Sequence, residues 1–304
     1  MPITLAGLTE LGLGHLEDVE IFEKKKEKEV QKQPKKMVEP KAVELTEKDY
    51  IYDKSFRCPA CDNEFTAKIM KSTYTNTVAT DWDLRPLYQG IDVTKYDVVL
   101  CPKCGFATLK NYFAPITDYQ IKQIREKISN KVNLQVHEGE IYTYEEAMER
   151  YKLALATSVV IHAKNSVKAY ICLKIAWLLR GYAEFLAKSD NVSAAGLEMI
   201  RREEEEYLHN AYEGFVSARE AEGLALCGMD EATTDYLIAA LALRFKNYKE
   251  AGRLVSKILR TSPSKSKVRE KAKDIRDEIV AGLKLEEEQK ALEAQGSEQA
   301  ASET

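Results

Sequence analysis

Four cysteines in the chain have the spacing of metal ligands. Cys58 and Cys61 form one C-x-x-C pair, Cys101 and Cys104 form a second, and 39 residues separate the two pairs. Two such pairs can place four thiolates around one tetrahedral zinc ion. A site with four protein ligands keeps no position open for water or substrate. The spacing therefore predicts one structural Zn²⁺ and no chemistry at the metal.

The turns that hold the cysteines support this interpretation. Both turns begin Cys-Pro, and proline fixes one φ angle and removes one amide donor, so that the remaining N–H groups can point at the thiolates. Gly105 follows the second pair, where a left-handed residue commonly completes the turn, and Asp62 and Asn63 take its place after the first. A disulfide or a redox-active pair is the alternative. The sequence shows neither a secretory context nor a thioredoxin-like pattern, which favours zinc.

A second group of polar residues lies between the two pairs, and it consists of Asp81, Asp83, Arg85 and Tyr88. Paired carboxylates beside an arginine could bind a ligand or take part in catalysis. They could equally form a clamp in which the guanidinium group of Arg85 donates to an acid. We favour the clamp, and we predict that Asp81 or Asp83 holds Arg85 in a structural role.

The composition narrows the class of protein. Of 304 residues, 31% are charged and 44% are hydrophobic, and the formal net charge is −4. No apolar run approaches the ~18 residues of a membrane span, and the N-terminus does not resemble a signal peptide, so we expect a cytoplasmic protein. Residues 51–115 carry eight lysines and arginines against seven acids, so the basic footprint of a nucleic-acid-binding surface is missing.

The chain divides into four segments. Residues 1–50 join a short apolar and acidic stretch to a Glu/Lys/Gln/Pro-rich stretch, and we expect a flexible segment. Residues 51–115 are predicted to form a zinc-ribbon-like module, with strands at 65–69 and 96–100. Residues 116–285 are predicted to be a helical domain and 286–304 a disordered tail. The fold class is therefore mainly α with a small β module.

The helical segment shows start signals and a recurring spacing. Capping boxes begin at Thr117 and Thr143. An alanine is followed by a large apolar residue four positions later and by a second apolar residue three positions after that, at 147–154, 211–218 and 251–258. This small–large pattern resembles tetratricopeptide repeats, and the best copy spans 232–265. The copies lie 64 and 40 residues apart instead of 34, so an unrelated helical bundle is the alternative.

The repeat pattern predicts a concave binding face. If Ala176 and Ala239 are equivalent small positions, this face carries Leu173, Trp177, Arg180, Gly181, Tyr236, Ala240, Leu243 and Arg244. The candidate partner-binding residues are the aromatic and arginine members, Trp177, Arg180, Tyr236 and Arg244, because these residue types are enriched at binding hot spots. The alternative is that the aromatic side chains belong to the core.

Several of these motifs occur together in one bacterial family. Asp81-x-Asp83-x-Arg85-Pro86-x-Tyr88-x-Gly90, then Tyr96-Asp97-Val98 and Cys101-Pro102-x-Cys104-Gly105-Phe106-Ala107, resembles the family called domain of unknown function 2225. Residues 147–155 and 176–180 are similar to its helical half, so the resemblance covers about residues 50–280. It implies a zinc ribbon joined to helical repeats and carries no activity.

Catalytic signatures are missing from the sequence. It contains no H-E-x-x-H, no phosphate-binding loop and no G-x-S-x-G motif, so we predict no catalytic residue. By elimination, we interpret the chain as a non-catalytic, zinc-stabilised scaffold that binds a protein or peptide partner through its helical domain. A nucleic-acid-associated zinc-ribbon protein and an enzyme that uses Asp81, Asp83 and Arg85 are the alternatives. The sequence identifies neither the partner nor the process.

Overall fold

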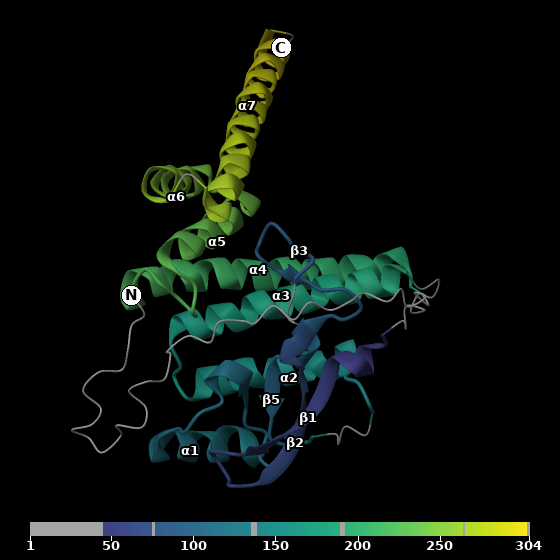
Figure 1. The fold of residues 1–304 in the computed structure, drawn as a ribbon. Coiled ribbons are helices and arrows are strands. Elements are labelled where there is room, and N and C mark those ends of the chain that lie inside the picture. The colour runs from purple at the N-terminus through teal and green to yellow at the C-terminus, as the bar shows by residue number, and fades with distance from the viewer. Residues whose placement is uncertain (1–44, 75–76, 135–138, 189–191, 264, 303–304) are drawn as a thin grey trace, which may run out of the picture. The chain divides into compact units, whose positions relative to one another are not determined.

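A computed structural model describes residues 45–302 apart from 75–76, 135–138, 189–191 and 264. Most of the segment expected to be flexible, residues 1–44, lies outside the described residues. Residues 45–304 form one compact unit. Its described part contains seven α-helices and three short antiparallel strand pairs. The fold is therefore mainly α with a small β module near the N-terminus, as the sequence predicts (Figure 1).

Two β-hairpins carry the cysteine pairs in their turns. Strand β1 (Ile51–Arg57) pairs with β2 (Glu64–Met70), and β5 (Val98–Leu100) pairs with β6 (Ala107–Leu109). The short strands β3 (Ala79–Thr80) and β4 (Pro86–Leu87) pair in the segment between them. The strand expected at 96–100 begins two residues late. The preceding residues 93–96 form a 3-10 turn, because the side chain of Asp92 caps it by accepting from the Thr94 amide.

Both predicted capping boxes are present. Thr117 precedes α1 (Asp118–Ile124), which continues into a π-helical turn over 125–129, and Thr143 precedes α2 (Tyr144–Val160). Buried α2 residues share a hydrophobic cluster with β5, β6 and α3. The β module and the helices thus have a common core, and a domain boundary at 115–116 stays a prediction.

Helix α3 (Asn165–Ala187) lies at the centre of the compact unit (Figure 1). It is buried on almost every side, as a helix between two layers must be. Leu173 and Trp177 face one hydrophobic cluster together with α4 (Ala194–Glu222), while Ile171 and Ile175 face the cluster of α2 and the strands. A lysine interrupts this apolar helix at 174, where its ammonium group forms a buried ion pair of 2.5 Å with Asp97.

The C-terminal part begins with a helical hairpin of α5 (Glu231–Arg244) and α6 (Tyr248–Thr261), which packs against α7 (Lys267–Ser302). The small and large positions at 211–218 and 251–258 are buried, but the assignment to tetratricopeptide repeats stays a prediction. Helix α7 continues through the segment expected as a disordered tail from 286, because its Glu, Ala, Gln and Lys residues favour helix. Among the described residues, no helix has both the length and the apolar character that crossing a membrane requires.

Two helical glycines give a matched test of the packing between α3 and α4. A Cβ atom on Gly214 in α4 would lie 2.8 Å from the Cβ of Ala169 in α3, whereas one on Gly252 in α6 would have no neighbour within 4 Å. We expect Gly214→Ala to lower the free energy of unfolding by about 1–3 kcal/mol through overpacking. Gly252→Ala should raise it by about 0.5–1 kcal/mol through helix propensity. Denaturant titrations measure both, and a stabilised Gly214→Ala variant would contradict the close approach.

Candidate functional site

The four predicted metal ligands lie together. The sulfur atoms of Cys58, Cys61, Cys101 and Cys104 are all within 4.8 Å of one another. Cys58 and Cys104 sulfurs are 3.6 Å apart, and Cys61 and Cys101 sulfurs are 3.7 Å apart. These distances exceed the ~2.05 Å of a disulfide bond, and all four cysteines are free. The cluster could hold a metal ion.

The two cysteine turns are built alike. The amide of Asp62 donates to the Cys58 carbonyl at 2.9 Å, and the amide of Gly105 donates to the Cys101 carbonyl at 3.0 Å. Both residues have left-handed backbones, with φ of 58° at Asp62 and 74° at Gly105. The first turn therefore takes the conformation predicted for it without a glycine, since aspartate tolerates this region better than most residues.

An element outside residues 51–115 covers the cluster. Ile124 in α1 and Ile128 in the π-helical turn pack against the buried cysteines, and the hydroxyl of Ser129 donates to the Cys104 carbonyl at 2.8 Å. Hydrogen bonds from the Cys104 and Cys58 thiols lower the pKa of Cys101. For Cys58, the hydrogen bond with Cys101 and burial raise the pKa to about 12. Four thiolates this close repel one another, and a bound cation would offset that repulsion.

The loop after β3 forms a buried network of ion pairs with α3 and α4. Arg85 Nε lies 2.6 Å from an Asp81 oxygen, so the predicted ion pair is present. Arg180 in α3 contacts the same Asp81 at 3.0 Å and the fully buried Asp83 at 2.7 Å. Glu204 in α4 lies 2.7 Å from Arg180. The acids and arginines thus neutralise one another inside the molecule.

The same loop also reaches α5 and α7. The backbone carbonyl of Trp82 accepts from the Tyr236 hydroxyl at 2.8 Å, and the ring of Trp82 covers the guanidinium group of Arg180. Lys271 in α7 donates to the Asp81 carbonyl at 3.2 Å. A single loop therefore contacts α3, α5 and α7 directly, and it reaches α4 through Arg180.

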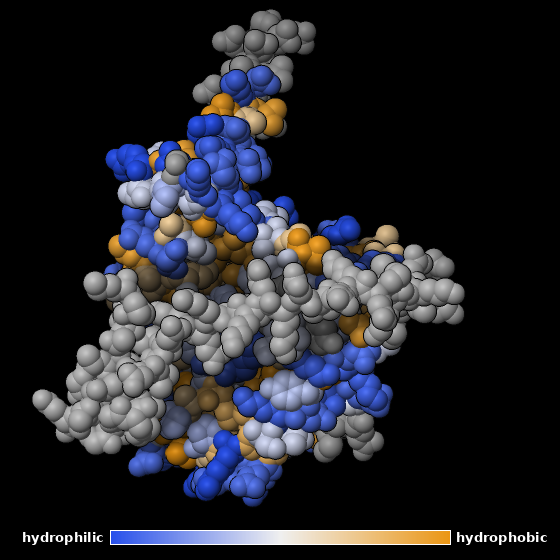
Figure 2. All heavy atoms as spheres, in the orientation of Figure 1, coloured by the Kyte–Doolittle hydropathy of each residue, from blue (hydrophilic) through white to orange (hydrophobic). Residues whose placement is uncertain are grey.

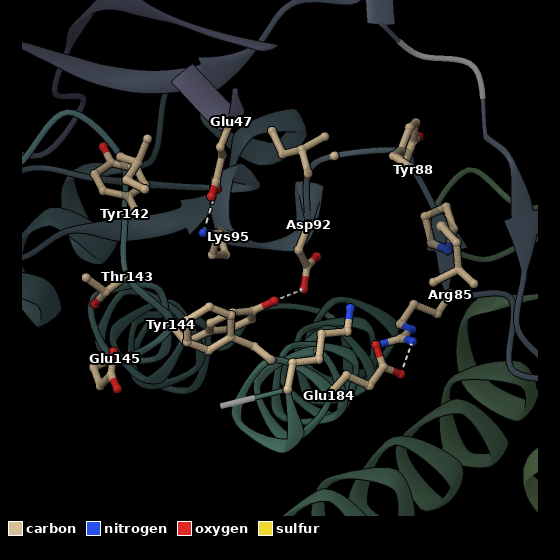
Figure 3. Close-up of a pocket in the computed structure, with 18 residues that line it drawn as sticks. Glu47, Arg85, Tyr88, Asp92, Lys95, Tyr142, Thr143, Tyr144, Glu145 and Glu184 are labelled. Atoms are coloured by element: carbon tan, nitrogen blue, oxygen red, sulfur yellow. Dashed lines mark hydrogen bonds and ion pairs between the residues drawn. The ribbon is translucent and has the colours of Figure 1, made fainter. Parts of the chain in front are cut away.

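Beside this loop lies a cavity of about 520 Å³ (Figure 3). Asp92 accepts from the Thr94 amide at 3.0 Å and from the Tyr144 hydroxyl at 3.2 Å. Lys95 pairs with Glu47 at 2.5 Å. The other labelled lining residues include Arg85, Tyr88, Tyr142, Thr143, Glu145 and Glu184.

Among the residues that line this cavity, the sequence analysis proposes Arg85, Tyr88 and Gly181 as candidate functional residues. It misses Asp92 and Lys95. The pattern Asp92-x-Thr94 is a local capping signal that could have placed Asp92 at a turn, but nothing local indicates that this turn meets α2 and α3.

The structure separates the predicted partner-binding residues. Trp177 and Tyr236 are 4% and 3% exposed, and Arg180 is held in the ion-pair network. The positions of Trp177 and Arg180 favour structural roles. Arg244 is exposed and pairs with Glu205. A binding role for any of the four stays a prediction.

The two halves of the predicted concave face do not share a surface. The α5 set lines one groove of about 750 Å³, and it consists of Tyr236, Ala240, Leu243 and Arg244. The α3 set does not contribute to this groove: Leu173 is fully buried, and Gly181 lines the cavity beside the loop. The apolar residues of α3 are spaced for burial between two layers of the fold. For this reason the α3 positions that match the α5 set by spacing are mostly buried and do not line the groove.

The ion-pair network gives a prediction about stability. Arg180→Ala would leave Asp83 buried without a counter-ion, so we expect it to lower the free energy of unfolding by about 3–5 kcal/mol. Arg85→Ala should cost about 1–3 kcal/mol, because Asp81 keeps Arg180 as a partner. Arg202→Ala removes an exposed arginine whose one ion pair within the described residues is with Glu198 at 3.6 Å, and it should change stability by less than ~0.5 kcal/mol. Urea unfolding that ranks the three variants differently would refute a structural role for the network.

The chain has a match among known families over most of its length. The model of the family described as uncharacterised protein conserved in bacteria (DUF2225) matches residues 51–279. No curated protein and no solved structure matches the chain. The matched region includes both cysteine turns, the ion-pair loop and the helices as far as α7. The chain therefore belongs to the bacterial family of domain of unknown function 2225.

Proposed function

We propose that the chain is a non-catalytic, zinc-stabilised interaction protein that binds a protein or peptide partner through its helical part. The observation that carries this proposal is the groove between α5 and α7. Four residues that the sequence pattern assigns to one face of α5 line it together. Tetratricopeptide-like hairpins bind peptides on such a face.

The cysteine cluster fits zinc. Four sulfurs placed ~2.3 Å from a tetrahedral Zn²⁺ lie about 3.8 Å from one another. Two of the sulfur pairs are separated by 3.6 and 3.7 Å. Cys58, Cys61, Cys101 and Cys104 would then fill the coordination sphere, and the ion would cross-link the turns of the two hairpins. A closed site of this kind supplies stability and not chemistry.

The groove offers apolar contacts with charges at its edge. Tyr236, Ala240 and Leu243 on α5 line it together with Ile275 and Leu285 on α7. The charged lining residues are of both signs, and they are Arg244, Lys246, Lys271, Asp274 and Glu278. Leu285 is 59% exposed, and Figure 2 shows apolar residues standing among hydrophilic ones on α7. This surface suits an amphipathic peptide helix whose apolar side enters the groove.

Neither alternative function gains support from a specific contact. The carboxylates of Asp81 and Asp83 are engaged by arginines, so they are poorly placed to act on a substrate. Four of the eight basic residues at 51–115, in addition to Arg85, pair with acids, which reduces the positive surface available to nucleic acid. These pairs are Arg57–Asp62, Lys68–Asp53, Lys95–Glu47 and Lys110–Asp97.

Metal content tests the zinc assignment. We expect one zinc ion per chain by elemental analysis, and we expect Cys101→Ser to lose it. Structural zinc contributes an apparent ~10–16 kcal/mol in small peptides, so amides of residues 51–115 should lose protection from hydrogen exchange while those of α5 and α6 keep it. Cys227→Ser changes a free cysteine outside the cluster and should retain the ion. Protein prepared under reducing conditions that contains no zinc would contradict the assignment.

Capture from a bacterial lysate tests the groove. We expect Leu285→Glu to place a charge at the apolar wall and to weaken binding of the captured partner at least tenfold, without loss of helicity. The control is Met199→Glu, which changes an apolar residue that is 73% exposed on α4 and outside the groove. The proposal predicts partners retained by wild type and Met199→Glu but lost by Leu285→Glu. Identical capture by all three proteins would exclude the groove as the binding surface.

A further inference from the structure

One carboxylate in the cavity beside the ion-pair loop lacks a counter-ion. Figure 3 shows Asp92 pointing into the cavity with the Tyr144 hydroxyl bonded to it. No basic side chain pairs with Asp92 within the described residues. Removal from water raises the pKa of Asp92, and its bonds with Thr94 and Tyr144, together with the nearby charge of Arg85, only partly oppose this. Because Arg85 is itself paired with Asp81 and Glu184, the molecule holds a desolvated acid here without an ion-pair partner within the described residues.

The other recessed charges of the cavity already have partners. Arg85 lies 2.5 Å from Glu184, in addition to its contact with Asp81. Lys95 pairs with Glu47, which also accepts from the Tyr96 hydroxyl at 2.7 Å. What the recessed part of the cavity lacks is therefore a positive charge.

A glycine in the middle of α3 makes room for this acid. A Cβ atom at Gly181 would lie 2.3 Å from an Asp92 carboxylate oxygen and 3.3 Å from the Tyr144 hydroxyl. Glycine inside a helix costs about 0.5–1 kcal/mol relative to alanine. The close approach of the carboxylate to the helix thus requires a residue that α3 would otherwise disfavour.

We propose that this cavity binds a small organic cation, with a primary ammonium or guanidinium group, and that Asp92 is its counter-ion. The volume of about 520 Å³ is within the ~300–1,000 Å³ range of small-molecule sites. Tyr88, Tyr144 and Phe185 line the same space and provide apolar and aromatic surface for the carbon skeleton of such a ligand. The site shares no lining residue with the groove between α5 and α7, so it does not depend on the proposed function.

The test is an NMR titration of the full-length, zinc-containing protein with n-butylammonium, n-butylguanidinium and the uncharged 1-butanol. Asp92→Asn removes the charge and keeps an oxygen that can cap the turn at Thr94. The matched control is Asp230→Asn, which makes the same change at the cap of α5, where Asp230 accepts from the Thr233 amide at 2.8 Å. We expect wild type and Asp230→Asn to bind at least one of the two cations in preference to butanol, and Asp92→Asn to bind it at least tenfold more weakly.

Two further variants keep the test decisive if Asp92→Asn does not fold. Gly181→Ala should displace the carboxylate and weaken cation binding. Lys188 also lines the cavity and forms no ion pair within the described residues, so Lys188→Gln removes a competing cation and should leave binding equal or tighter. Three results would overturn the proposal: butanol binding as well as the cations, Asp92→Asn or Gly181→Ala binding like wild type, or Lys188→Gln losing the cation.

Discussion

Two arginines and two aspartates meet where the loop after β3 reaches α3, and the arrangement of the surrounding elements depends on their pairing. Asp83 is fully buried, and the side chain of Arg85 is only 5% exposed. Moving such charges out of water costs several kcal/mol for each ion, and good geometry with every partner present is needed to offset it. The loop, α3 and α4 must therefore pack in the one arrangement that brings all of these charges together. We regard the network as a source of structural specificity more than of net stability.

Residues 79–87, in the middle of the segment between the cysteine pairs, depend on this network because they have little regular structure of their own. Their strands β3 and β4 are two residues long, and Leu84 takes a left-handed backbone with φ of 69°, which is unfavourable for a leucine. The cysteine cluster holds the two ends of the segment, and Arg85 and Arg180 hold its middle. Clustered cysteines at the ends and ion pairs in the middle together hold this segment in place.

The groove between α5 and α7 and the cavity beside the loop each take a wall from this segment. Thr80 and Trp82 line the groove on the α5 and α7 side, whereas Arg85 and Tyr88 line the cavity on the α2 and α3 side. Asp81 lies within the first wall and Asp83 lies between the two walls in the sequence, and their ion pairs with Arg180 fix this segment against α3. The polar residues that resemble catalytic ones are thus better explained as the support of two neighbouring surfaces.

The sequence predicts mainly local features of this arrangement. The two capping boxes and the Asp81–Arg85 pair each lie within a few residues, and all are present. The cysteine cluster is a long-range contact, between residues 40 and 46 apart in the chain, and the repeated C-x-x-C motif predicts it. Arg180, the partner of both aspartates, lies 99 residues after Asp81 and 97 residues after Asp83 in the chain. Lys174 and Arg180 interrupt the apolar middle of α3, and that is a signal for buried ion pairs, because a buried stretch of helix can carry a charge only beside an opposite one. These buried basic residues predict that an acid lies beside each of them, but the sequence does not say which acid. The fold brings Asp97 to Lys174 and Asp83 to Arg180.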